Sequence, residues 1–396
     1  MMSRRALADT TVYLIFFLLC FIPTNIFFID GIDSLVLMVV TPLLLFYSLK
    51  RYSIYLKNKE ISLYLCWFIW LVITCITAVR PSASFQLLKT ISGGVMLSLI
   101  YYMLAHEKKL IPYLYTGYIV ILLAEIYYAN TTFVGEALGT DIRANDVKLN
   151  ANGLAYMTFY SLCSIYVLGE LEIDKRLSTI VRVGFFFMIF VTVYVAFITA
   201  SRQVLPIALS AWLLLFFRRY VKKMNASRAL LIVLLVIVGY YLYSHVFESL
   251  YSDSLLATRT ERTDNTDTRY LVIVEALEIS SNNLLVGVGP GNFVHLSRYG
   301  IFTHNSYAEI LVSCGVLGLI LYLSIIINFL KNQIKRYRRT KDALFYSFFL
   351  IGLIWAIYNI LYVFYVGVYL IPFLFLLMGH SDCLYREKYS KQISVR

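Results

Sequence analysis

The chain has 396 residues, of which 60% are hydrophobic and only 15% are charged, and its mean hydropathy is +0.73. Soluble domains carry about 25% charged residues, so the composition excludes a secreted domain, a cytosolic enzyme and a disordered chain. The excess of 35 Lys and Arg over 23 Asp and Glu is interpreted through the positive-inside rule of membrane proteins, and we expect no nucleic-acid partner.

Apolar segments recur along the whole chain. A membrane helix needs about 20 mostly apolar residues, and we predict an all-α, polytopic membrane protein with about twelve transmembrane helices. Asn359 separates the last two segments only weakly, so counts of eleven and thirteen stay open. The predicted spans are 11–29, 34–49, 61–79, 84–104, 110–128, 153–169, 183–200, 203–217, 229–246, 310–330, 343–359 and 361–379.

Most Lys and Arg residues fall in every second connection between these spans, as in the segment 331–341. The positive-inside rule then places both termini in the cytoplasm. Two longer segments, 129–152 and 247–309, become outer loops of a single integral membrane domain that covers residues 1–396. Every cytoplasmic connection is short and no GxxxxGK[ST] loop is present, so the function is expected on the outer face.

The second outer loop contains the apolar run YLVIVEALEI, interrupted by Glu275 and Glu278. Acids three residues apart lie on one helical face, which predicts an amphipathic helix on the membrane surface or against the bundle. The motif GVGPGNF at 287–293 follows. It predicts a tight turn whose amides face an anion or, as the favoured interpretation, a plain turn, because the strand and helix of a dinucleotide fingerprint are missing.

The segment THNSYAEILVSCGVLGLILYL begins the next predicted span. Ser306 and Glu309 have the spacing of a capping box. His304 and Asn305 are therefore expected at the mouth of a membrane helix, where backbone amides and the positive end of the helix dipole face outward. An isolated histidine is more often structural than catalytic, but this setting favours a functional role.

Arg143, Arg202 and Arg269 stand on the arginine-poor outer side. A guanidinium binds phosphate oxygens in a bidentate fork, so each is a candidate anion ligand. The alternatives are snorkelling and an exposed ion pair, which is worth at most about 1 kcal/mol. The sequence shows no cluster with metal-ligand spacing, and we expect neither a metal nor a cofactor.

Four segments in this order resemble the O-antigen ligase and O-antigen polymerase superfamily of bacterial envelope glycosyltransferases. They are NANGLAY at 150–156, TASRQVLPIALSAWLLL at 199–215, DTRYLVIVEALEI at 267–279, and GVGPGNF followed by THNSYAEILVSCGVLGLILYL. The last is the most specific. The resemblance implies a multi-pass protein of the bacterial inner membrane, similar in architecture to the GT-C glycosyltransferases.

The resemblance also implies an inverting, metal-independent transfer on the outer face. The donor is a glycan on undecaprenyl diphosphate, and the acceptor is another lipid-linked repeat unit or lipid A-core, with membrane lipids around the site. By matching position, the catalytic set comprises Arg202, Arg269 and His304. The substrate-binding candidates are Arg143, Asn152 and Asn305, together with the turn residues Gly287, Gly289 and Gly291.

Several alternatives stay open at this point. Within the family, ligase and polymerase activities are not separated, and His304 is either the base or a ligand of the diphosphate. From other classes, a lipid-linked glycan flippase and a non-enzymatic membrane scaffold compete. A flippase needs a charged central cavity, and the scarcity of charges deep within the predicted spans argues against it.

Overall fold

The computed structural model describes residues 36–137, 151–171, 175–199, 204–220, 268–363, 365, 367 and 370–394. Every regular element among these residues is helical, which confirms the predicted all-α class. The predicted spans 11–29 and 229–246 lie outside the described residues, so the number twelve stays a prediction. Five described helices are long and apolar enough to cross a membrane: Lys59–Ile76, Pro81–Leu104, Ile111–Thr131, Arg176–Thr199 and Ser306–Thr340.

The chain divides into two compact units. The first comprises Met1–Pro23, Ile29–Leu114 and Asn265–Arg396, and the second comprises Thr24–Phe28 and Tyr115–Asp264. The helices of the second unit are α6 (Ile111–Ala137, from Tyr115 on), α7 (Ala151–Glu170), α8 (Lys175–Thr199) and α9 (Val204–Tyr220).

Aromatic stacking and hydrogen bonds from side chains to backbone carbonyls join the helices of the second unit. The indole of Trp212 on α9 stacks on Phe185 of α8, with ring centroids 5.8 Å apart and planes 12° apart. Its Nε1 donates a hydrogen bond to the Phe185 carbonyl at 3.2 Å. On α7, Ser161 Oγ donates to the Tyr118 carbonyl of α6 at 2.8 Å. Such side chain to backbone bonds can join apolar helices where water is absent.

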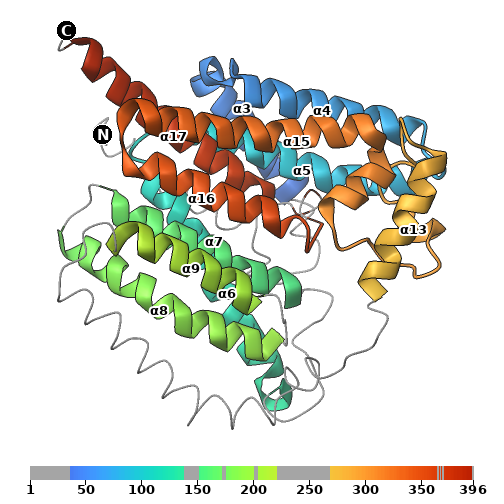
Figure 1. Ribbon diagram of the computed structural model, residues 1–396, viewed down its shortest axis with the longest axis horizontal. Helices are drawn as coiled ribbons and strands as arrows, with labels where there is room; N and C mark the ends of the chain where they lie inside the picture. The colour runs from blue at the N-terminus through green and yellow to red at the C-terminus, as the bar shows by residue number, and fades with distance from the viewer. Residues whose placement is uncertain are drawn as a thin grey trace. The chain divides into compact units, whose positions relative to one another are not determined.

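The first unit is built around α15, which contacts most of its neighbours (Figure 1). Helices α4, α13, α16 and α17 pack against α15. Helix α5 packs against α17. The elements are η1 (Val36–Val40), α3 (Thr41–Tyr52), η2 (Ser53–Leu56), α4 (Lys59–Ile76), α5 (Pro81–Leu104), α13 (Thr268–Asn282), α14 (Phe293–Leu296), α15 (Ser306–Thr340), α16 (Ala343–Tyr358) and α17 (Leu370–Ser394).

Most predicted spans that fall on described residues coincide with a helix, but the last one is wrong in its bounds. Residues 361–363 are not helical, and α17 begins at Leu370 and continues to Ser394. The carbonyls of Asn359 and Tyr362 accept hydrogen bonds from the amide of Ser306, at 2.7 and 3.1 Å. This stretch therefore closes over the start of α15 instead of forming a helix of its own.

The first predicted outer loop, 129–152, also differs from the structure at both ends. Helix α6 continues into it as far as Ala137, and α7 already begins at Ala151. The residues between these two helices lie outside the described part of the chain.

Basic residues from separate connections meet at one end of the first unit, which we call the basic end. Lys108 pairs with Glu387 at 2.5 Å, and Lys388 pairs with Asp342. The start of α4, the end of α5, the end of α15 and the charged part of α17 all lie there. Helix α4 therefore begins at the basic end, whereas α5 and α15 end there. These directions agree with the predicted alternation of basic and non-basic connections.

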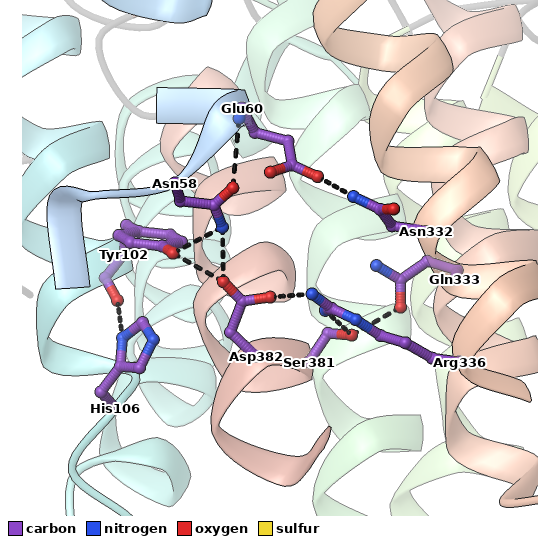
Figure 2. Close-up of polar contacts among 9 residues, drawn as sticks. All are labelled: Asn58, Glu60, Tyr102, His106, Asn332, Gln333, Arg336, Ser381 and Asp382. Carbon is purple, nitrogen blue, oxygen red and sulfur yellow. Dashed lines mark hydrogen bonds and ion pairs between the residues drawn. The ribbon is translucent and has the colours of Figure 1, made fainter. Parts of the chain in front are cut away.

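A buried polar cluster joins four helices at the basic end (Figure 2). Asp382, only 5% exposed, accepts hydrogen bonds from Asn58 Nδ2 and Tyr102 Oη, both at 2.6 Å, and pairs with Arg336. Arg336 also donates to Ser381 Oγ at 2.7 Å. Both carboxylate oxygens of Asp382 are thus satisfied, which a buried charge requires.

We expect Asp382→Ala to destabilise the protein by about 3 kcal/mol or more, because it leaves the largely buried Arg336 without its partner. The matched control is Arg51→Ala, which breaks the exposed Arg51–Glu107 pair of 4.0 Å and should cost about 1 kcal/mol at most. Thermal unfolding of the purified variants in detergent measures the difference. Equal losses of stability in the two variants would contradict the structural role given to the cluster.

Candidate functional site

Helix α15 is interrupted near its non-basic end. Gly315 has φ 69° and ψ −174°, so the helix breaks there although it continues on both sides. A break of this kind frees the carbonyls of the preceding turn, and free carbonyls are costly at membrane depth unless the protein binds them.

The residues after α13 bind the freed groups. The amides of Val288 and Gly289 donate to the carbonyls of Val312 and Ser313, at 2.8 and 2.9 Å, and the amide of Val316 donates back to Leu284 at 2.8 Å. Trp70 of α4 donates its Nε1 to the Cys314 carbonyl at 2.9 Å. The GVGPGN loop is therefore the hydrogen-bonding partner of a broken helix.

This use of the loop limits its use as an anion site. Gly287 and Gly289 have positive φ as a tight turn requires, but the amide of Gly287 donates to Asn283 at 2.8 Å and that of Gly289 is taken by Ser313. These two amides are thus used within the protein, which agrees with the favoured interpretation as a plain turn. Gly291 also has positive φ and lies in the same turn, against Leu87 of α5.

Asn292 fastens this loop to the corner between α4 and α5. Its buried side chain accepts a hydrogen bond from the Arg80 amide at 2.7 Å and donates to Ser84 Oγ at 2.7 Å. Ser84 in turn donates to the Pro290 carbonyl at 2.7 Å. Asn292 is not among the predicted site residues. Its position beside a proline and three glycines is the signal that marks it as a residue that orients backbone.

His304 stands directly before the first turn of α15. It has φ 52° and its side chain is partly exposed. The next residue, Asn305, is the N-cap, and its Oδ1 accepts hydrogen bonds from the amides of Tyr307 and Ala308 at 2.9 and 3.1 Å. His304 therefore lies at the mouth of a membrane helix, as predicted, in a left-handed backbone conformation that only a minority of non-glycine residues adopt.

The predicted capping box is wrong in its register. Asn305 caps the helix in place of Ser306, and Glu309 accepts from the amide of Thr303 at 3.0 Å. Asn and Ser are comparable N-cap residues, so the spacing alone did not distinguish them. Ser306 is instead turned toward Tyr362, whose carbonyl accepts from its hydroxyl at 2.7 Å.

The segment DTRYLVIVEALEI is helical, and α13 packs against the bundle. Val272 and Ala276 are buried with Val288, Phe293 and Val312. The two acids lie three residues apart on this helix, as predicted, but Glu275 is buried whereas Glu278 is exposed.

Glu275 is stable as a buried acid because the loop after α14 binds it. Ser297 Oγ donates to it at 2.5 Å, and the backbone amide and Nε of Arg298 donate at 3.1 and 3.0 Å. Burial opposes ionisation, but these hydrogen bonds and the charge of Arg298 outweigh it and lower the pKa of Glu275. A lowered carboxyl pKa stabilises the fold at neutral pH, and this contribution is lost as the pH falls through that pKa.

The structure thus describes part of the predicted site. His304, Asn305, Arg269 and the three glycines belong to the first unit, with Arg269 partly buried in the first turn of α13. Arg143 and Arg202 lie outside the described residues. Asn152 lies in the first turn of α7, in the second unit, and its side chain lies outside the described part.

Gly315→Ala should destabilise the protein strongly. A Cβ there would meet the Leu285 carbonyl oxygen at 2.2 Å, so the loop would have to leave the helix break. The control is Gly300→Ala, where φ is similarly positive, +62°, but nothing lies within 4 Å. This control should lose only about 1–2 kcal/mol, the cost of the left-handed conformation. Thermal unfolding measures both, and similar losses would show that the close contact is unimportant.

The contacts around Gly315, His304 and α13 fall in the segment that matches a known family. Residues 184–323 match the family model described as O-antigen ligase. A search of the curated proteins found no match. The matched segment includes three of the four motifs on which the resemblance was based, and this part of the chain is therefore similar to the O-antigen ligase family.

Proposed function

We propose that this protein is a glycosyltransferase that transfers a glycan from undecaprenyl diphosphate to an acceptor hydroxyl on the outer face of the bacterial inner membrane. The observation that carries the proposal is the position of His304, which stands partly exposed at the N-terminus of a membrane helix within the family segment. At the non-basic end, a titratable side chain there can meet a lipid diphosphate at the level of the membrane surface.

The proposed reaction is a single displacement with inversion at the anomeric carbon. The acceptor oxygen attacks that carbon while His304 takes the hydroxyl proton. The bond to the diphosphate oxygen breaks, and the diphosphate leaves with the bonding electrons. An imidazole suits proton transfer near neutral pH. Arg202 and Arg269 are proposed to hold the diphosphate and stabilise its developing charge. Arg143, Asn152 and Asn305 are proposed to bind the substrate.

The reaction is proposed to need no metal, because the sequence offers no ligand cluster and the arginines supply the positive charge. The test is to incubate purified protein with lipid-linked repeat units in EDTA, with and without lipid A-core. Product is expected despite the chelator. A ladder of longer lipid-linked chains identifies a polymerase, and a glycan on lipid A-core identifies a ligase. Product that appears only after a divalent ion is restored would contradict the metal-independent mechanism.

The proposal requires that segment 247–309 faces outward and that both termini are cytoplasmic. The gathering of basic residues at the opposite end of the first unit supports this orientation. A single cysteine at Ser254, in a cysteine-free background, is expected to react with an impermeant thiol reagent in intact spheroplasts. Labelling that appears only after lysis would reverse the orientation and remove the proposed site from the outer face.

The arginines and the histidine are expected to fail in different ways when substituted. Arg→Lys at position 202 or 269 should already impair transfer, because lysine keeps the charge but loses the planar fork. Arg→Ala should in addition weaken donor binding. His304→Ala should lower turnover by about 10²-fold or more, the usual range for a lost base, with little change in donor binding.

The matched control for His304→Ala is His295→Ala, since His295 is exposed in α14 of the same unit. It should keep near-normal activity. Product formation and donor binding are measured in parallel on each purified variant. If His304→Ala stays active, the site assignment is wrong. If it abolishes donor binding, His304 is a diphosphate ligand and not the base.

A further inference from the structure

Glu309 is a buried acid that the proposed chemistry does not use. Its side chain has 0% exposure, although it lies in the first turn of α15, only a few residues from His304. Its Oε2 accepts the backbone amide of Thr303 at 3.0 Å, and its Oε1 accepts the Ser313 hydroxyl at 3.4 Å. The shorter contact ties the residue before His304 to the helix that follows it.

Two further contacts close a ring around His304. Thr303 Oγ1 donates to the Asn305 carbonyl at 2.8 Å, and the Asn305 amide donates to Thr303 Oγ1 at 3.2 Å. Asn305 then caps α15. Thr303 and Asn305, on either side of His304, are therefore bound to each other, and Glu309 binds Thr303 to the helix. These three residues form the ring.

The backbone of His304 depends on this ring. A left-handed conformation costs about 1–2 kcal/mol for a residue with a Cβ, and such residues persist where the surroundings fix them. Without the bond from Thr303 to Glu309, the segment gains freedom to relax to an ordinary conformation. The direction of the imidazole would then change, because the side chain follows the backbone.

We propose that Glu309 is a positioning residue for His304, an inference that rests on the proposed glycan transfer. Its carboxylate fixes the amide of Thr303 and thereby the orientation in which His304 meets the acceptor hydroxyl. A displacement of about 1 Å of a reacting group can lower a rate by 10²-fold. Glu309 itself makes no contact with the substrate in this scheme.

The test compares two substitutions, one that keeps the length of the side chain and one that keeps its charge. Glu309→Gln keeps an oxygen that can accept from Thr303, and its amide nitrogen can donate to the Ser313 hydroxyl, which also accepts. Glu309→Asp keeps the charge but is one methylene shorter and cannot reach Thr303. We therefore expect near-normal kcat for Gln and a fall of about tenfold or more for Asp, with donor binding unchanged within about twofold in both.

Hydrogen–deuterium exchange of the peptide that contains Thr303 supplies a structural readout. Exchange should increase in Glu309→Asp and stay near normal in Glu309→Gln. The control is Glu278→Ala, which removes an exposed acid of α13 and should change neither kcat nor exchange at Thr303. Melting temperatures of all variants separate a positioning effect from a general loss of folding.

Several outcomes would overturn the inference. Normal kcat in Glu309→Asp, or a low kcat without faster exchange at Thr303, would show that Glu309 does not position His304. A low kcat in Glu309→Gln would show that the charge and not the hydrogen bond matters. If instead the unmodified protein makes no product, or His304→Ala is fully active, the proposed function fails first and this inference fails with it.

Discussion

The first unit depends on the hydrogen bonds between the interrupted α15 and the loop that follows α13. A membrane helix that breaks at Gly315 exposes carbonyls which lipid cannot satisfy. The amides of Val288 and Gly289, together with the indole of Trp70, satisfy them. The same contacts fix the path of the chain from α13 into α15, and so they determine where Arg269 and His304 are presented.

The motif residues between Gly287 and Asn305 therefore divide between two tasks. The glycines and Asn292 shape and fasten backbone, and Asn305 caps a helix. His304 contributes an imidazole that is partly exposed at the mouth of the helix. Much of the motif thus preserves a local conformation that holds a small number of chemical groups, and an alteration of the backbone residues is expected to be as harmful as one of the base.

The sequence predicts the helices well because hydrophobic length is a strong signal in membrane proteins. It failed at the start of the predicted span 361–379, where residues 361–363 are not helical and the Tyr362 carbonyl accepts a hydrogen bond from the Ser306 amide, since hydropathy does not report hydrogen bonding. It missed the break at Gly315, because glycine is common inside membrane helices. The sequence also did not indicate which of the two acids of α13 is buried. Glu275 is buried because Ser297 and Arg298, more than twenty residues further along the chain, donate hydrogen bonds to it.

The polar cluster at the basic end has a consequence for the order in which the protein is made. Asn58 is 324 residues away from Asp382, which accepts its hydrogen bond, and Tyr102 is 280 residues away. A ribosome that synthesises the chain from its N-terminus releases α4 and α5 long before α17 exists. Until then, these polar side chains must stay near the membrane surface, with water or an insertion factor as their partner. Nascent chains that end before α17 should therefore be targets for membrane quality control, even when all their earlier helices have been inserted.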